Sequence, residues 1–143
     1  MLETLIRNRT VKHLEQNNLL KNSQHGFRNK RSCLTNLLDF LYDILNQYDE
    51  NKAVDIIYID FQKAFSKVPH KRLLSKLKAH GIRGNVLKWI ENWLTDRKQR
   101  VAIKGKASAW TSVTSGVPQG SVQGPLLFLI YINDIDEDLT CII

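Results

Sequence analysis

The stretch from Val54 to His70, which reads VDIIYIDFQKAFSKVPH, constrains the fold more than any other part of the chain. Its beginning is rich in isoleucine, valine and tyrosine, a composition that favours a short strand buried in a sheet. That run ends at Asp60. A carboxylate at the end of a buried strand needs a partner. A divalent metal ion suits its oxygen atoms, and backbone amides or a following turn are the simpler alternative. Pro69 disfavours helix just before it and predicts a new helix from about that point.

Apolar residues at three- and four-residue steps predict helices along much of the remaining chain. The clearest pattern runs from Leu34 to Tyr48, where Ser32 can serve as the N-cap. Further helices are predicted over residues 2–19, 69–81, 86–94 and 126–133. Two short strands over 101–103 and 109–113 are predicted to form a hairpin with a basic turn at 104–106, and residues 115–124 a glycine- and proline-bearing loop. This order is neither all-helical nor a regular βαβ alternation, so the predicted class is α+β.

Charge is unevenly distributed along this 143-residue chain, whose formal net charge is +7. Residues 60–110 include 13 basic and 3 acidic side chains, a net charge of +10. That excess suits a polyanion such as nucleic acid, and a solvated, lysine-rich helix face is the alternative. The tail is acidic instead, and its four carboxylates are those of Asp134, Asp136, Glu137 and Asp138.

Other protein classes are disfavoured. Cys33 and Cys141 are far apart and match neither zinc-ligand nor disulfide-framework spacing. The longest apolar run, residues 126–132, is much shorter than the roughly 20 residues of a membrane span. Charged residues near the N-terminus interrupt any secretory signal. The sequence therefore predicts a soluble, intracellular protein with no membrane partner.

Two blocks in a fixed order carry a resemblance to a known family. Asp60 is followed by Ala64 and Phe65, and SGVPQGSVQGP follows some fifty residues later, over 115–125. These blocks resemble motifs A and B of reverse transcriptases, and their sequences are most similar to those of the non-LTR (LINE-type) retrotransposon branch. The segment SQHGFRNKRSCLTNLL, residues 23–38, resembles the fingers-side block of that family.

The resemblance implies a fold and a set of ligands. The implied fold is a partial right-hand polymerase, with helices packed on a small, incomplete antiparallel sheet. Residues 1–53 would form fingers-side helices and a loop, and residues 54–143 the first half of the palm. The implied ligands are Mg²⁺, an RNA template, a DNA primer and deoxynucleoside triphosphates. Two magnesium ions would activate the primer hydroxyl and hold the triphosphate.

The resemblance also implies roles for individual residues. Asp60 becomes the catalytic, metal-binding carboxylate, and the main chain at Phe61 and Gln62 would lie near the incoming triphosphate. Phe65 would lie under the sugar, where its ring would collide with a 2′-hydroxyl and select deoxynucleotides. The alternative is that Phe65 belongs to the core.

Motif B and the fingers-side loop supply the remaining candidates. Gln119 and Gly120 would contact the nucleotide and the template base together; alternatively they form a polar turn. The candidate phosphate contacts, which could also be ordinary surface residues, are Arg28, Lys30 and Arg31.

The sequence also departs from the family pattern. Motif C, an aromatic residue followed by Ala-Asp-Asp, occurs nowhere in the chain. Ser66 stands where relatives commonly have aspartate, and Gln123 where an apolar residue is usual, which suggests drift in an unconstrained copy. The predicted function is therefore a fragment of an RNA-directed DNA polymerase that is inactive alone. The alternatives are a non-catalytic nucleic-acid-binding remnant and a chain that forms no stable protein, because half a palm leaves sheet edges unpaired.

Overall fold

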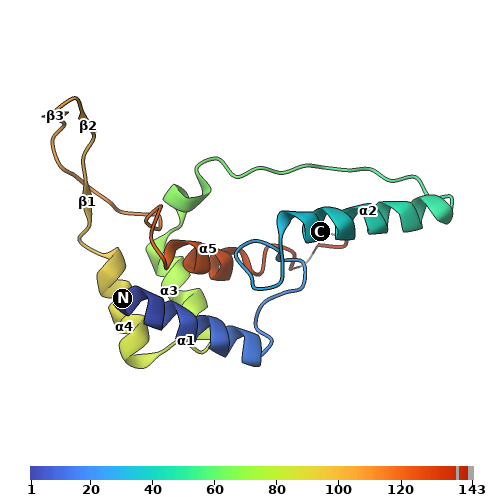
Figure 1. Cartoon of the computed structure of the whole chain (residues 1–143), viewed down its shortest axis with the longest axis horizontal. Helices are drawn as coiled ribbons and strands as arrows, with labels where there is room; N and C mark the ends of the chain where they lie inside the picture. Colours follow the sequence, from blue (N-terminus) through green and yellow to red (C-terminus); the bar gives the residue numbers. More distant parts are fainter. Residues whose placement is uncertain (138, 142–143) are drawn as a thin grey trace.

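The computed structural model describes residues 1–137 and 139–141, which form an elongated molecule (Figure 1). Its helices are α1 (Leu2–Gln16), α2 (Cys33–Asp49), α3 (His70–Ala79), α4 (Gly84–Leu94) and α5 (Gly124–Ile132), with a 3₁₀ turn η1 (Ala64–Lys67). Its strands are β1 (Lys98–Gln99), β2 (Ala102–Ile103), β3 (Lys106–Ala107) and β4 (Thr111–Ser112). The strands and α2 lie at opposite ends of the longest axis, and the other helices lie between them (Figure 1).

Helices α1, α3, α4 and α5 form the packed half of the molecule. Helix α3 contacts both α4 and α5, and its apolar face is fully buried through Leu73 and Leu77. Helix α1 joins this core through Leu14, whose side chain is also fully buried. The acidic tail folds back on the same half, because Lys76 pairs with Asp134.

The four predicted helices of this half form in the structure, with boundaries that differ from the predicted ones by up to three residues. Pro69 is the N-cap of α3. Gly81, with φ of +79°, follows the end of that helix, as expected of a residue that adopts the left-handed conformation without strain. Pro125 lies in the first turn of α5, where its missing N–H costs no hydrogen bond.

Helix α2 forms as predicted but does not pack as predicted. Ser32 caps it in a complete capping box with Thr35. The helix has no buried residue, and its leucines remain exposed along the apolar face. Periodicity and capping are properties of the helix itself, whereas burial requires a second surface that these residues do not meet.

The predicted buried strand at 54–59 is wrong. The segment between α2 and η1 is extended and exposed, and Ile57, Tyr58 and Ile59 are 80–83% exposed. No strand of the described residues pairs with it. A strand is stabilised by a neighbouring backbone, which β-prone composition does not itself supply. The Tyr58 ring lies 6.2 Å from the Phe40 ring of α2, which links the two exposed elements.

The predicted hairpin forms near its expected position with different strand limits. Strand β2 pairs with β3, and β1 pairs with β4, both antiparallel. Lys104 and Gly105 both have positive φ, as in the type I′ turn that joins tight hairpins. All four strands are exposed. Helices do occur together with small antiparallel sheets, but the expectation of helices packed on a sheet is wrong, because these helices pack on one another.

Candidate nucleotide-binding site

The two motif segments are side by side although about fifty residues separate them in sequence. The N–H of Val117 donates to the carbonyl of Phe65 at 2.8 Å, and the Gly116 N–H donates to the carbonyl of Val68 at 2.8 Å. The hydroxyl of Ser115 donates to the Ser66 carbonyl at 2.9 Å. These bonds fasten the base of the loop at 115–124 to η1 and the residue after it.

Close approach of these backbones requires glycine at position 116. Gly116 has φ of +87°, and a Cβ atom there would lie 2.7 Å from the Ser66 oxygen and 2.8 Å from the Phe65 oxygen. Any side chain would therefore meet backbone atoms that cannot move aside easily. From the sequence alone, this glycine is indicated only as part of a loop.

Phe65 is anchored by aromatic contacts. Its ring stacks on Phe128 of α5 with centroids 4.7 Å apart and meets the Phe27 ring edge-on at 6.0 Å. It is half-buried and packs against the core. Phe65 is thus held in one orientation, and part of its surface remains accessible beside the loop.

Asp60, Phe61 and Gln62 lie on the exposed extended segment that leads into η1. The side-chain oxygen of Gln62 accepts a hydrogen bond from the ammonium of Lys67 at 2.9 Å. A cavity of about 320 Å³ adjoins this segment, and Phe61, Gln62 and Phe128 line part of it. Phe61 and Gln62 therefore border this cavity, whereas Asp60 does not line it and does not end a strand as expected.

The described residues do not make a magnesium site by themselves. Mg²⁺ takes about six oxygen ligands in octahedral geometry. Asp60 offers a single exposed carboxylate, and the part of the chain that the structure describes contains no group of three or more residues of the metal-binding types. Any magnesium bound here would need ligands that these residues do not supply.

Gln119 and Gly120 are presented at the tip of the motif B loop, where both are exposed. Ser121 closes the turn below them: its hydroxyl donates to the Pro118 carbonyl at 2.7 Å and accepts from the Gly124 N–H at 2.9 Å. The loop therefore offers Gln119 to solvent on a defined turn. Its role in binding a nucleotide stays a prediction.

Two arginines of the basic fingers-side loop bond to other residues of the protein. The Arg28 guanidinium donates to the carbonyls of Lys21 and Gln24 at 2.6 and 3.3 Å. Arg31 pairs with Asp39 at 3.2 Å. Lys30 is exposed. Two of the three candidate phosphate contacts thus already have protein partners, and their binding to nucleic acid remains a prediction.

Gln123 has a structural role, whereas its departure from the usual apolar residue suggests only drift. Its side chain is buried, and its amide donates to the Glu3 carbonyl at 3.0 Å. This bond joins the start of α1 to the start of α5, so the polar residue has a structural partner. A single glutamine in an apolar context gives no sequence signal of such a contact.

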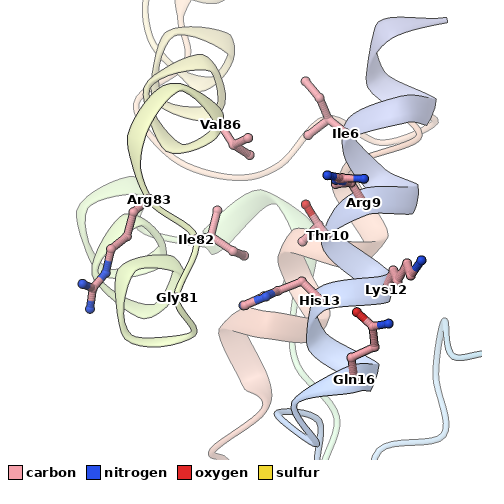
Figure 2. Close-up of a pocket in the computed structure, with 10 residues that line it drawn as sticks. All are labelled: Ile6, Arg9, Thr10, Lys12, His13, Gln16, Gly81, Ile82, Arg83 and Val86. Atoms are coloured by element: carbon pink, nitrogen blue, oxygen red, sulfur yellow. The ribbon is translucent and has the colours of Figure 1, made fainter.

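A larger cavity, of about 490 Å³, lies away from the motif segments, between α1 and the turn from α3 to α4. In Figure 2, Ile6 and Val86 point toward each other across it, whereas Lys12 and Arg83 point away. Lys12 and Arg83 therefore do not converge on one ligand position in this cavity.

Carboxylates of the acidic tail are bound by lysines. Lys76 hydrogen-bonds to Asp134 and holds the pKa of that carboxyl below its usual range. Lys21, at 2.5 Å, likewise lowers the pKa of Asp136. Asp138 lies outside the described residues. No helix in the described part of the chain combines the length and apolar character needed to cross a membrane.

Comparison with known proteins defines the class. Residues 2–142 match the reverse transcriptase (RNA-dependent DNA polymerase) family. A probable RNA-directed DNA polymerase from transposon BS of Drosophila melanogaster is 31% identical over 139 residues, which cover 93% of this chain and 15% of that protein. The polymerase from mobile element jockey of Drosophila funebris is 31% identical over 135 residues, or 94% of this chain and 15% of that protein. No solved structure matches.

The chain therefore belongs to the reverse transcriptase family. Within it, the chain is similar to a segment of the RNA-directed DNA polymerases of non-LTR (LINE-type) retrotransposons. A retrotransposable element R2 polyprotein of Popillia japonica is also similar, at 27% identity over 86 residues, covering 60% of this chain and 14% of that protein. The chain spans about 15% of the length of the two Drosophila polymerases.

Proposed function

We propose that this chain supplies part of the fingers (residues 1–53) and the first half of the palm (residues 54–143) to an enzyme that synthesises DNA on an RNA template. The observation that carries this proposal is the fastening of the motif B loop, through Gly116 and Val117, to the backbone of Phe65 and Val68. That contact brings the two segments expected to bind one nucleotide to the same place.

Each motif residue then has a task. Asp60 would provide one carboxylate to the magnesium that holds the triphosphate, and the main chain at Phe61 and Gln62 would lie beside that triphosphate. The anchored ring of Phe65 would exclude a 2′-hydroxyl. Gln119, on its exposed turn, would contact the nucleotide and the template base, with Gly120 allowing close approach.

The same proposal accounts for the extended segment at 54–59. Its backbone and apolar side chains are exposed, as is the leucine face of α2. Exposed apolar surface of this kind marks an interaction site. We propose that the rest of the polymerase covers the exposed apolar surface of this segment and of α2.

A chimera tests these roles. Residues 1–143 replace the aligned segment of the jockey polymerase, and magnesium-dependent extension of a DNA primer on an RNA template is measured. We expect activity that Asp60→Ala abolishes and Asp55→Ala, a matched change in the same exposed segment, preserves. Phe65→Ala should admit ribonucleotides. Equal activity in the Asp60 and Asp55 variants would refute the assignment, and extension by the 143-residue chain alone would refute its predicted inactivity.

A second candidate function is nucleic-acid binding without chemistry, which the exposed cations favour. The turn and arms of the hairpin carry Lys98, Arg100, Lys104 and Lys106, all exposed. Binding that neutralises phosphates weakens as salt rises, with a slope of about −0.7 per single-stranded contact. Filter binding should show a shallower slope after Lys104→Ala with Lys106→Ala than after the control pair Lys12→Ala with Lys88→Ala. Absence of binding at low salt would end this alternative.

A further inference from the structure

One backbone oxygen at the base of the motif B loop is held by two side chains. The carbonyl of Gly116 accepts from Nε2 of His70 at 2.9 Å and from Nη2 of Arg97 at 2.8 Å. His70 is the first residue of α3, and Arg97 lies between α4 and β1. Gly116 itself is buried. A side chain from the start of α3 and one from the segment after α4 thus meet at one atom of the loop.

The donors are chemically suited to hold this oxygen. A carbonyl only accepts hydrogen bonds, so His70 must carry its proton on Nε2. The Arg97 guanidinium is charged, and a charged donor makes a stronger bond than a neutral one. A second bond, from Nε of Arg97 to the Leu94 carbonyl at 3.2 Å, fixes the guanidinium at the end of α4.

The peptide unit between Gly116 and Val117 is consequently fixed at both ends. Its carbonyl is held by His70 and Arg97, and its N–H donates to the Phe65 carbonyl at 2.8 Å. Because a peptide unit is planar, fixing both groups fixes the direction in which the chain continues. The chain continues directly to Gln119.

We propose that His70 and Arg97 are positioning residues that hold the motif B loop in register with Phe65, a role that rests on the proposed nucleotide site. They do not touch the nucleotide themselves. They set the orientation of the Gly116–Val117 peptide unit. That unit is bonded to the backbone of Phe65 and leads to the turn that carries Gln119.

Amide hydrogen exchange on the 143-residue chain tests the structural half of this inference. His70→Ala and Arg97→Ala should each accelerate exchange over residues 115–121 by about tenfold, the scale of losing a bond to a buried carbonyl. His70→Gln and Arg97→Lys, which keep a donor, should restore part of the protection. Arg100→Ala is the matched control, because Arg100 lies three residues after Arg97 and stacks on the Trp110 ring.

The results separate positioning from general stability. Faster exchange confined to the loop, with α3 and residues 126–130 of α5 unchanged, supports the proposal. Unchanged loop exchange in both alanine variants overturns it, as does an equal acceleration in all helices. For alanine variants that do not fold, the donor-keeping substitutions decide. Loop exchange that is partly accelerated by His70→Gln or Arg97→Lys, with the helices unchanged, supports a held carbonyl, and loop exchange unchanged by both substitutions overturns it.

The jockey chimera tests the functional half. Arg97→Ala should raise KM for deoxynucleotides about tenfold with a smaller change in kcat, and Arg97→Lys should recover part of that loss. If the chimera is inactive but the isolated chain still shows the exchange effect, the proposed function is refuted and the positioning role of His70 and Arg97 is retained. If the chimera is active and neither KM nor loop exchange changes in the variants, only the positioning role of His70 and Arg97 is refuted.

Discussion

The packed half and the exposed half of this molecule have equally clear helical sequences but different environments. In α3, Leu73 and Leu77 are fully buried, whereas in α2 the corresponding apolar face is open, and Leu37 is 51% exposed. Helix α2 also has the better N-cap. Local signals therefore decide whether a helix forms, and only the presence of a second apolar surface decides whether it is buried.

The largest expected effect comes from truncating one leucine in each half, in two separate variants. Leu77→Ala should lower the free energy of unfolding by about 2–5 kcal/mol, because it leaves a cavity in the core. Leu37→Ala, a matched deletion on exposed α2, should change it by less than about 0.5 kcal/mol. Urea unfolding of both variants measures the difference, and similar losses would show that α2 is buried in solution.

A second test concerns the contact between the motif segments. Gly116→Ala places a Cβ against two backbone oxygens, whereas a Cβ added at Gly120, which has φ of +77°, would meet no atom within 4 Å. Gly120→Ala should cost only the left-handed strain of about 1–2 kcal/mol, and Gly116→Ala should cost more. Equal losses in thermal or urea unfolding would contradict the close packing at Gly116.

A third test lies within the exposed half. Ser32→Ala removes the capping box of α2 and should weaken its first turn by about 1 kcal/mol. Because α2 contributes no buried residue, amide exchange at residues 33–36 should accelerate about fivefold while the urea midpoint changes little. Ser75→Ala, an exposed serine within α3, is the control. A large shift in the midpoint would mean that α2 unfolds together with the core.

The smallest expected effect is a pH dependence in the packed half. The pKa values of Asp134 and Asp136 are lowered by their hydrogen bonds to Lys76 and Lys21. A carboxyl with a lowered pKa stabilises the fold above its ordinary value of 3.8, and this contribution is lost as the pH falls through the lowered value. Unfolding measured from pH 6 to pH 2 should therefore show less acid sensitivity in Asp134→Asn with Asp136→Asn. Unchanged sensitivity would contradict the pairing.

The sequence was sufficient for elements that depend on nearby residues. Pro69 marks the start of α3, Ser32 caps α2, and Lys104 with Gly105 turns the hairpin. It was insufficient at 54–59, since pairing depends on a strand that these residues do not meet. The two motif blocks lie together, since Gly116 lies against Phe65 and Ser66, and their binding of one nucleotide stays a prediction.

The parts of the site that sequence could not predict are contacts between distant side chains and backbone. Nothing in the sequence distinguishes His70 from the other scattered histidines, and Gln123 suggests only drift. Both bond to carbonyls far along the chain, at Gly116 and Glu3. Such bonds leave no periodicity or spacing in one sequence, because any exposed carbonyl can be the acceptor.

The elongated arrangement also separates charge. The segment 97–106, which includes the hairpin turn, has five basic residues and no acidic one, whereas residues 33–51, with α2, have four acidic residues and no basic one. These segments lie at opposite ends of the longest axis (Figure 1). The molecule is consequently an electric dipole. A nearby strand of nucleic acid would orient it so that the basic hairpin faces the phosphates.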